Sequence, residues 1–287
     1  MWRPYFFPLV IRYKSNKRSG CEFAPQITDG ISQKDKGYAA DCNRFGVFEN
    51  PSQTLTETER SRIMKKGLTE LVFILDRSGS MRGLEQDTIG GFNGMIDRQR
   101  REAGEVLVSA VLFDDKREVI YDRINIRSIH EMTEKEYYVG GCTALLDAVG
   151  YAIHHIENVR YRMNSEEKPE KTIFIITTDG MENASRDYTY EKVKHMIEKQ
   201  QENNWEFIFL GANIDAAGEA ARMGIRSSRA VNYNCDAEGT ALNYEVLNKT
   251  VSKMRKCKSA SEMSVLLDKE ECFEEIRKDY ETRGRKS

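Results

Sequence analysis

Between residues 71 and 233, short apolar runs alternate with amphipathic segments. Unbroken apolar runs of strand length predict buried strands at 71–75, 106–113, 172–178, 206–210 and 230–233. Residues 117–126 instead alternate apolar and polar side chains, as expected of an edge strand with one face in water. Because only Asp114, Asp115 and Lys116 separate this segment from the preceding run, the two are predicted to form an antiparallel hairpin.

The segments between these runs predict helices. Ile89, Phe92 and Met95 have helical spacing, in a helix expected to begin close to Ser80 and to use the glycines at 90 and 91 for close packing on the sheet. A glycine turn at 140–141 leads into a second helix, and further helices are expected at 189–200, 215–222 and 238–256. Strands and helices joined by short connections indicate an α/β fold in which helices cover both faces of one sheet.

The two ends of the chain lack this alternation. Residues 1–63 have no sustained periodicity, and a poorly structured extension is expected over residues 1–66. Met64 opens a sequence that looks like a bacterial N-terminus running into the first strand, so Met64 is a candidate true start; an intact mass that includes Met1 would disprove this. The domain is expected to span 67–258, and 259–287 is expected to form a charged, helical tail that packs on the domain or on a partner.

Composition argues against several classes of partner. The formal charge is −2 and basic and acidic residues are interspersed, which does not favour nucleic acid or an anionic membrane surface. The apolar stretch at 4–11 is too short to cross a bilayer and contains Pro4 and Pro8. The six cysteines include no C-x-x-C pair, so we expect reduced thiols in a cytoplasmic protein, with Cys142 as a small buried residue.

Oxygen-bearing side chains follow two of the apolar runs. Asp76, Ser78 and Ser80 come directly after the first run, and Asp179 comes after the run at 172–178. In open α/β sheets, sites form beyond the carboxyl ends of the strands, where Thr143 from the intervening loop can join them. Carboxylate and hydroxyl oxygens suit Mg²⁺ or Mn²⁺ far better than zinc or copper.

These residues resemble a known motif. D-x-S-x-S at 76–80, the threonine of GCTALLDA at Thr143 and the aspartate of TTDGMEN at Asp179 are similar to the metal-ion-dependent adhesion site of von Willebrand factor type A domains. The resemblance covers about 67–233 and points to the intracellular bacterial type. It implies a three-layer, doubly wound, mostly parallel six-stranded sheet with one antiparallel edge strand. It also implies that Ser78, Ser80 and Thr143 contact the metal directly, while Asp76 and Asp179 act mainly through bound water.

Such a site favours binding over catalysis. If the carboxylates act mainly through water, neutral hydroxyl ligands leave the cation electron-poor, and an aspartate or glutamate of another protein can complete its coordination. We therefore predict a divalent-cation-dependent protein-binding module that is not an enzyme. The sequence does not indicate the identity of the partner protein.

Two alternatives stay open. A magnesium-dependent phosphatase of the haloacid dehalogenase type also has an aspartate at the end of its first strand, but its D-x-D motif needs a second carboxylate where this chain has Ser78. The other alternative is a structural scaffold with a non-functional metal site. Asp-x-Ser-x-Ser and Asp179-Gly180 also occur in ordinary turns, and Thr143 could cap a helix. Neither a P-loop nor a G-x-G-x-x-G motif is present, so nucleotide binding has no motif behind it.

Several residues near the motif have less specific roles. We interpret three arginines as solvated loop residues rather than as contacts to an acidic partner: Arg77, Arg82 and Arg186. Asn183 and Asp147 are expected to support the site and the packing of the following helix rather than to bind the metal.

Overall fold

The computed structural model describes residues 64–284, and the expectation for residues 1–63 lies outside this part of the chain. Six strands are present in it: β1 Lys65–Asp76, β2 Glu105–Phe113, β3 Arg117–Asn125, β4 Pro169–Thr178, β5 Trp205–Ala212 and β6 Ala230–Tyr233. The α-helices are α2 Glu85–Arg101, α3 Leu145–Arg162, α4 Tyr190–Glu202, α5 Ala216–Arg222, α6 Ala237–Lys256, α7 Ala260–Asp268 and α8 Glu274–Arg283. Short 3₁₀ turns include η2 Gly79–Met81 and η6 Glu270–Phe273.

The strands form one sheet in the order β3-β2-β1-β4-β5-β6. The β2–β3 pair is antiparallel, and the other neighbouring pairs are parallel. The predicted fold class, a mostly parallel six-stranded sheet with one antiparallel edge strand, is therefore confirmed. The chain extends the sheet from β1 to one side through β2 and β3, then returns to the other side of β1 through β4. The carboxyl ends of β1 and β4 thus meet where the strand order reverses, which is where open α/β sheets place their sites.

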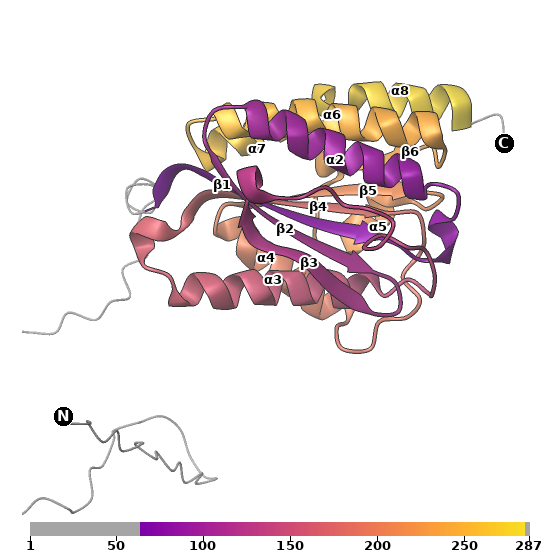
Figure 1. Ribbon diagram of the computed structural model, residues 1–287, viewed down its shortest axis with the longest axis horizontal. Helices are drawn as coiled ribbons and strands as arrows, with labels where there is room; N and C mark the ends of the chain where they lie inside the picture. The colour runs from indigo at the N-terminus through magenta and orange to yellow at the C-terminus, as the bar shows by residue number, and fades with distance from the viewer. Residues whose placement is uncertain (1–63, 285–287) are drawn as a thin grey trace, which may run out of the picture. The chain divides into compact units, whose positions relative to one another are not determined.

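Helices cover both faces of the sheet, as Figure 1 shows. The core on one face joins the sheet to α2, α6, α7 and α8, with Phe92, Leu247 and Phe273 among its buried side chains. The core on the other face joins the sheet to α3, α4 and α5, with Val149 and Ile197 among its buried side chains. The central strands are apolar on both sides because each face is covered.

The start of α2 differs from the sequence prediction. The chain leaves β1 through η2 and a turn at Gly83, where φ is +92°, so the helix begins at Glu85 and not close to Ser80. The glycines at 90 and 91 do not provide the predicted close packing on the sheet, because a Cβ added to Gly90 would meet nothing within 4 Å. A Cβ added to Gly91 would lie 2.1 Å from a ring carbon of Tyr244 in α6, so this glycine permits close approach of two helices.

Residues 260–283 add to the domain core. Leu267 of α7, Phe273 of η6 and Ile276 of α8 are buried in the same core as α2. Helix α8 lies beside the short edge strand β6, and Arg277 Nη2 donates to the carbonyl oxygen of Ala230 at 3.3 Å. Within residues 64–284, the helices are too short or too polar to cross a lipid bilayer.

Candidate metal site

Asp76 occupies the end of β1 and is 1% exposed. Its Oδ1 accepts a hydrogen bond from the backbone N–H of Ser78 at 2.7 Å, which fixes the turn that follows the strand. Its Oδ2 accepts from Thr178 Oγ1 at 2.5 Å, at the end of the neighbouring strand β4. One carboxylate therefore holds together the segments that leave β1 and β4.

The two predicted serines and Asp179 form a continuous chain of side-chain contacts. Ser78 Oγ lies 3.0 Å from Ser80 Oγ, and Ser80 Oγ donates to Asp179 Oδ1 at 2.6 Å. Ser78 and Asp179 are buried, whereas Ser80 is exposed. The cluster is therefore buried at its base and open to solvent on the side of Ser80.

Thr143 borders the same space from the segment before α3. A Cβ added to Gly180 would lie 2.8 Å from Thr143 Oγ1 and 3.3 Å from Ser80 Oγ, so both hydroxyls face the small volume that the missing side chain leaves. Thr143 does not cap α3, because the N-cap position belongs to Ala144. All five residues predicted from the sequence thus come together at one edge of the sheet.

Glycines bring the first two segments into contact. Gly79 N donates to the carbonyl oxygen of Gly141 at 3.1 Å, and Gly140 N donates to that of Arg77 at 2.9 Å. Gly141 has a φ of +73°, and a Cβ there would lie 2.2 Å from Asp115 Oδ1. A larger residue at 141 would therefore move the segment that carries Thr143.

The segment after Asp179 positions Thr143. Asn183 Oδ1 accepts from Thr143 N at 2.9 Å, and Asn183 N donates back to the Thr143 carbonyl at 3.0 Å. The Asp147 carboxylate accepts hydrogen bonds at 2.9 Å from the backbone N–H groups of Arg186, Asp187 and Tyr188. These bonds tie the segment after Asp179 to α3. Asn183 and Asp147 lie where they can support the site, as the sequence suggested, and neither contacts the hydroxyl cluster in the described hydrogen bonds.

Sequence reasoning missed Glu182. Its Oε2 accepts from the backbone N–H of Leu146 at 2.9 Å and from Ser185 Oγ at 2.8 Å, so it satisfies a free donor in the first turn of α3. Nothing in the local sequence marks this contact, because Glu182 and Leu146 are brought together by the order of the strands and not by the spacing of the motif.

Two predictions about neighbouring residues were wrong. Arg77 is 3% exposed, and its guanidinium donates to Asp114 Oδ2 at 2.9 Å and to Glu118 Oε2 at 2.8 Å. It is a buried link between the site segment and the β2–β3 hairpin, neither solvated nor free to meet a partner. Cys142 was expected to be buried and is exposed.

The two carboxylates of the cluster are those of Asp76 and Asp179. Among the residues that the structure describes, neither Asp76 nor Asp179 forms an ion pair. Burial raises the pKa of Asp76 to about 6, against the opposing effect of its hydrogen bonds from Ser78 and Thr178. Burial also raises the pKa of Asp179. A bound cation would supply the missing charge and favour the ionised form of both groups.

Cys235, which follows β6, is a further neighbour that the sequence did not indicate. Its Sγ donates to Asp179 Oδ2 at 3.6 Å. Burial and the nearby Asp179 carboxylate raise the pKa of this thiol to about 12, so it stays protonated and acts as a donor. The only available signal was its place just beyond a strand, at the same sheet edge as Asp179.

The donor set fits a hard divalent cation. Three hydroxyls and two carboxylates suit the oxygen preference of Mg²⁺ or Mn²⁺. Within residues 64–284, His, Cys, Asp and Glu side chains form no group of three or more that could hold a metal, so a cation here depends on the hydroxyls of Ser78, Ser80 and Thr143. The Thr143 and Ser80 hydroxyls both border the space beside Gly180, and Ser78 Oγ lies 3.0 Å from Ser80 Oγ.

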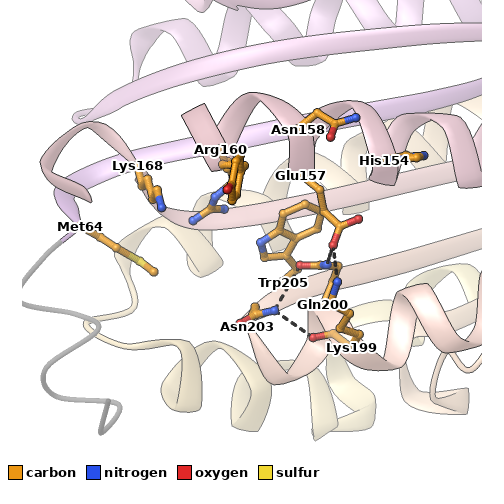
Figure 2. Close-up of a pocket in the computed structure, with 11 residues that line it drawn as sticks. Met64, His154, Glu157, Asn158, Arg160, Lys168, Lys199, Gln200, Asn203 and Trp205 are labelled. Atoms are coloured by element: carbon orange, nitrogen blue, oxygen red, sulfur yellow. Dashed lines mark hydrogen bonds and ion pairs between the residues drawn. The ribbon is translucent and has the colours of Figure 1, made fainter. Parts of the chain in front are cut away.

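A separate cavity lies near the amino ends of β4 and β5, between α3 and α4 (Figure 2). The Arg160 guanidinium stacks over the Trp205 ring at 5.4 Å and donates to Thr172 Oγ1 at 2.6 Å. Lys199 Nζ donates to Glu157 Oε1 at 2.9 Å. These cations already have partners, and none of the five predicted metal-site residues lines the cavity.

Comparisons with protein-family models and with curated proteins find no match. Among solved structures, the chain is similar to proximal thread matrix protein 1 from the mussel byssus, which is described with a zinc-occupied MIDAS motif. The two chains share 16% identity with a TM-score of 0.46, and the match covers 65% of this chain and 46% of that one. It is similar to the vWF domain of the pili tip protein Mfa5 from Porphyromonas gingivalis at 8% identity and a TM-score of 0.47, covering 67% and 97%. It is also similar to manganese-loaded TRAP protein from Plasmodium vivax at 16% identity and a TM-score of 0.42, covering 61% and 72%. Likenesses this distant assign the chain neither a family nor a function.

Proposed function

We propose that the chain is a divalent-cation-dependent protein-binding module of the von Willebrand factor type A kind, in a bacterial cytoplasmic protein. The observation that carries the proposal is the convergence of hydroxyls from two remote segments on the space beside Gly180. In this proposal Ser78, Ser80 and Thr143 hold Mg²⁺ or Mn²⁺ directly, and Asp76 and Asp179 act mainly through water. The bound cation supplies an electrophilic centre for an aspartate or glutamate of another protein.

The residues of the chain prepare this centre. Asp76 fixes the backbone of Ser78, and Asp179 orients Ser80 by accepting from its hydroxyl. Asn183 holds the backbone on both sides of Thr143. The oxygens are therefore arranged before any cation arrives, which reduces the conformational cost of binding it.

A phosphatase-like hydrolase is less well supported than binding. In that chemistry a second carboxylate two residues after the nucleophile acts as general acid. Ser78 stands at that position, and its hydroxyl lies 3.0 Å from the hydroxyl of Ser80. Turnover of p-nitrophenyl phosphate that requires Mg²⁺ and disappears in Asp76→Asn would favour the hydrolase. A scaffold with a non-functional site would show no change in melting temperature on adding Mg²⁺.

The test is a pull-down with the full chain in Mg²⁺, followed by elution with EDTA. A protein that binds through the cation should elute with EDTA and should be absent from the Ser78→Ala and Thr143→Val baits. Thr172→Val is a matched control, because Thr172 is a buried threonine far from the site whose hydroxyl contacts Glu70. Identical partners in Mg²⁺ and in EDTA, or on all baits, would contradict the proposal.

The cellular setting is also a proposal. The formal charge of −2 supports a partner that is neither nucleic acid nor a membrane surface. Four cysteines in residues 64–284, Cys142, Cys235, Cys257 and Cys272, are free thiols, which is consistent with a reducing cytoplasm. Cell fractionation with an antibody against the chain would test this, and recovery in a membrane or secreted fraction would contradict it.

A further inference from the structure

A polar cleft adjoins the hydroxyl cluster. It has a volume of about 580 Å³ and is lined from four parts of the chain: Ser80, Arg82, Gly83 and Leu84 after β1; Asn213 after β5; Asn234, Cys235 and Asp236 after β6; and Arg283 and Gly284 at the end of α8. Ser80 lines the cleft and also donates to Asp179. The cleft therefore opens directly onto the candidate metal site.

The walls of the cleft are fixed by contacts to the rest of the domain. Asn213 has a φ of +55°, a left-handed conformation that is uncommon for a residue other than glycine. The amide of Asn234 donates to Asp279 Oδ2 of α8 at 2.8 Å. Cys235 donates to Asp179, so the wall and a carboxylate of the metal site belong to one hydrogen-bond network. The cleft is thus present before a ligand binds.

Its two arginines differ in whether they have partners. Arg283 donates to Asp236 Oδ2 and to Asp279 Oδ2, each at 2.6 Å, so its charge is neutralised within the domain. Arg82 is exposed, and in the described part of the chain it has neither an ion pair nor a side-chain hydrogen bond. Arg82 therefore offers a guanidinium to a ligand in the cleft, two residues from Ser80.

We propose that this cleft receives the partner segment that carries the metal-binding carboxylate, and that Arg82 binds a second carboxylate of that segment. The inference rests on the function proposed above. A guanidinium presents paired N–H donors that match the two oxygens of a carboxylate. Because Ser80 and Arg82 line the same cleft, the partner segment needs two acids that point to the same side, as residues i and i+2 of an extended segment do. The partner recognised here is an acidic, extended stretch of protein.

The probes are two synthetic peptides of equal length, acetyl-Gly-Glu-Gly-Gly-Gly-amide and acetyl-Gly-Glu-Gly-Glu-Gly-amide. Each is titrated into the full chain in saturating Mg²⁺, and the dissociation constant is measured from NMR chemical shifts. The peptide with two carboxylates should bind about threefold to fivefold more tightly, which is the range of an exposed ion pair. This advantage should vanish in Arg82→Ala and persist in part in Arg82→Lys.

Arg186→Ala is the matched control. Arg186 is an exposed arginine on the segment after Asp179, and it does not line the cleft. The two-carboxylate peptide should keep its advantage in Arg186→Ala, which separates contact by Arg82 from a general attraction between basic protein and acidic peptide. The affinity for Mg²⁺ alone should stay within about twofold of wild type in Arg82→Ala, because a guanidinium that serves the partner does not hold the metal.

The other possible results would overturn either the role of Arg82 or the proposed function. Equal affinities for the two peptides in the wild-type chain, or an advantage that survives Arg82→Ala, would overturn the role of Arg82 while leaving the metal-bridged function in place. A changed Mg²⁺ affinity in Arg82→Ala would also overturn it. Absence of binding by both peptides in a chain that binds Mg²⁺ would overturn the proposed function together with this inference.

Discussion

Strand β1 carries two buried carboxylates whose surroundings are opposite. Glu70 is 0% exposed in the middle of the strand, and its Oε1 lies 2.7 Å from Arg123 Nη1, with Arg160 Nη1 at 3.9 Å from Oε2. Asp76, six residues later, is 1% exposed, and within residues 64–284 its carboxylate accepts from a hydroxyl and a backbone donor only. In the described part of the chain, Glu70 has a cationic partner and Asp76 does not.

This difference distinguishes a charge that is paired within the fold from one that the proposed cation would neutralise. Burying a charge is costly unless it is paired, and Arg123 and Arg160 offset part of that cost for Glu70, although burial still raises the pKa of Glu70. At Asp76 the cost is offset only in part by hydrogen bonds, so the metal-free protein is destabilised at this point. A divalent cation would remove the imbalance, and the same reasoning applies to Asp179.

The largest effect is expected from unpairing Glu70. Arg123→Ala should lower the free energy of unfolding by about 3 kcal/mol, because it leaves a buried carboxylate without its closest cation. Urea denaturation in EDTA measures this. Replacing Glu70 by Gln in the same background should recover part of the loss, because no unpaired charge remains. If Arg123→Ala lowered the free energy of unfolding by less than about 1 kcal/mol, the pairing of Glu70 with Arg123 would not matter for stability, and the contrast between Glu70 and Asp76 would be contradicted.

The next effect is that of the cation. Mg²⁺ at about 100 times its dissociation constant should raise the free energy of unfolding by about 2.7 kcal/mol, because the folded chain binds it and the unfolded chain does not. EDTA should reverse the increase. Arg123→Ala should show the same increment from a lower baseline, because its site is intact. An increment that falls with Arg123→Ala would mean that the two regions of β1 are coupled.

Asp76→Asn should stabilise the metal-free protein by about 1 to 2 kcal/mol, because it removes a buried charge that lacks a cationic partner. Asn Oδ1 can still accept from Ser78 N, and Thr178 can donate to the carbonyl oxygen of Gly180, which lies 3.1 Å from its Oγ1. The increment from Mg²⁺ should disappear in the same variant. Urea denaturation with and without Mg²⁺ measures both, and a variant that is less stable without metal would contradict this assignment.

The pH dependence of the metal-free protein has a definite sign. Because burial raises the pKa of Asp76 from 3.8 to about 6, the folded state holds a proton that the unfolded state has released between these values. The contribution of Asp76 to stability is therefore lost as pH rises from 3.8 through about 6. The difference in stability between Asp76→Asn and wild type should grow over that window in EDTA. A constant difference would contradict the raised pKa.

The smallest effect comes from two buried threonines. Thr172 Oγ1 donates to Glu70 Oε2 at 3.3 Å and accepts from Arg160 at 2.6 Å, so Thr172→Val should cost about 1 kcal/mol with or without metal. Thr143→Val should change metal-free stability by less than about 0.5 kcal/mol and should weaken Mg²⁺ binding about tenfold. Urea denaturation measures the metal-free stability, and calorimetric titration measures the affinity for Mg²⁺. If Thr172→Val and Thr143→Val changed stability and Mg²⁺ affinity equally, the assignment of Thr172 to the fold and of Thr143 to the metal site would be contradicted.

The sequence could predict the parts of the fold that depend on local pattern. The runs at 71–75 and 172–178 are apolar throughout because both faces of the sheet are covered, and their ends identify where Asp76 and Asp179 lie. The antiparallel hairpin of β2 and β3 was predictable from its three-residue link. The start of α2 was not, because η2 and the positive φ at Gly83 leave no periodic signal.

The neighbours of the site could not be predicted, because they depend on contacts between distant segments. Arg77 is buried because Asp114 and Glu118 of the β2–β3 hairpin face it, and the sequence around Arg77 contains no sign of them. Cys235 meets Asp179 because their loops leave the same edge of the sheet, 56 residues apart in the chain. Such contacts follow from strand order and side-chain direction, which a single sequence does not specify.

The central claim is that hydroxyls from two segments of the chain hold one divalent cation. The most direct measurement is the binding of Mn²⁺ followed by electron paramagnetic resonance, in wild type, Ser80→Ala, Thr143→Val and Thr172→Val. The account predicts one Mn²⁺ per chain that Mg²⁺ displaces, an affinity about tenfold or more weaker in Ser80→Ala and Thr143→Val, and an unchanged affinity in Thr172→Val. Equal Mn²⁺ affinity in all four proteins, or no bound Mn²⁺ in the wild-type chain, would contradict it.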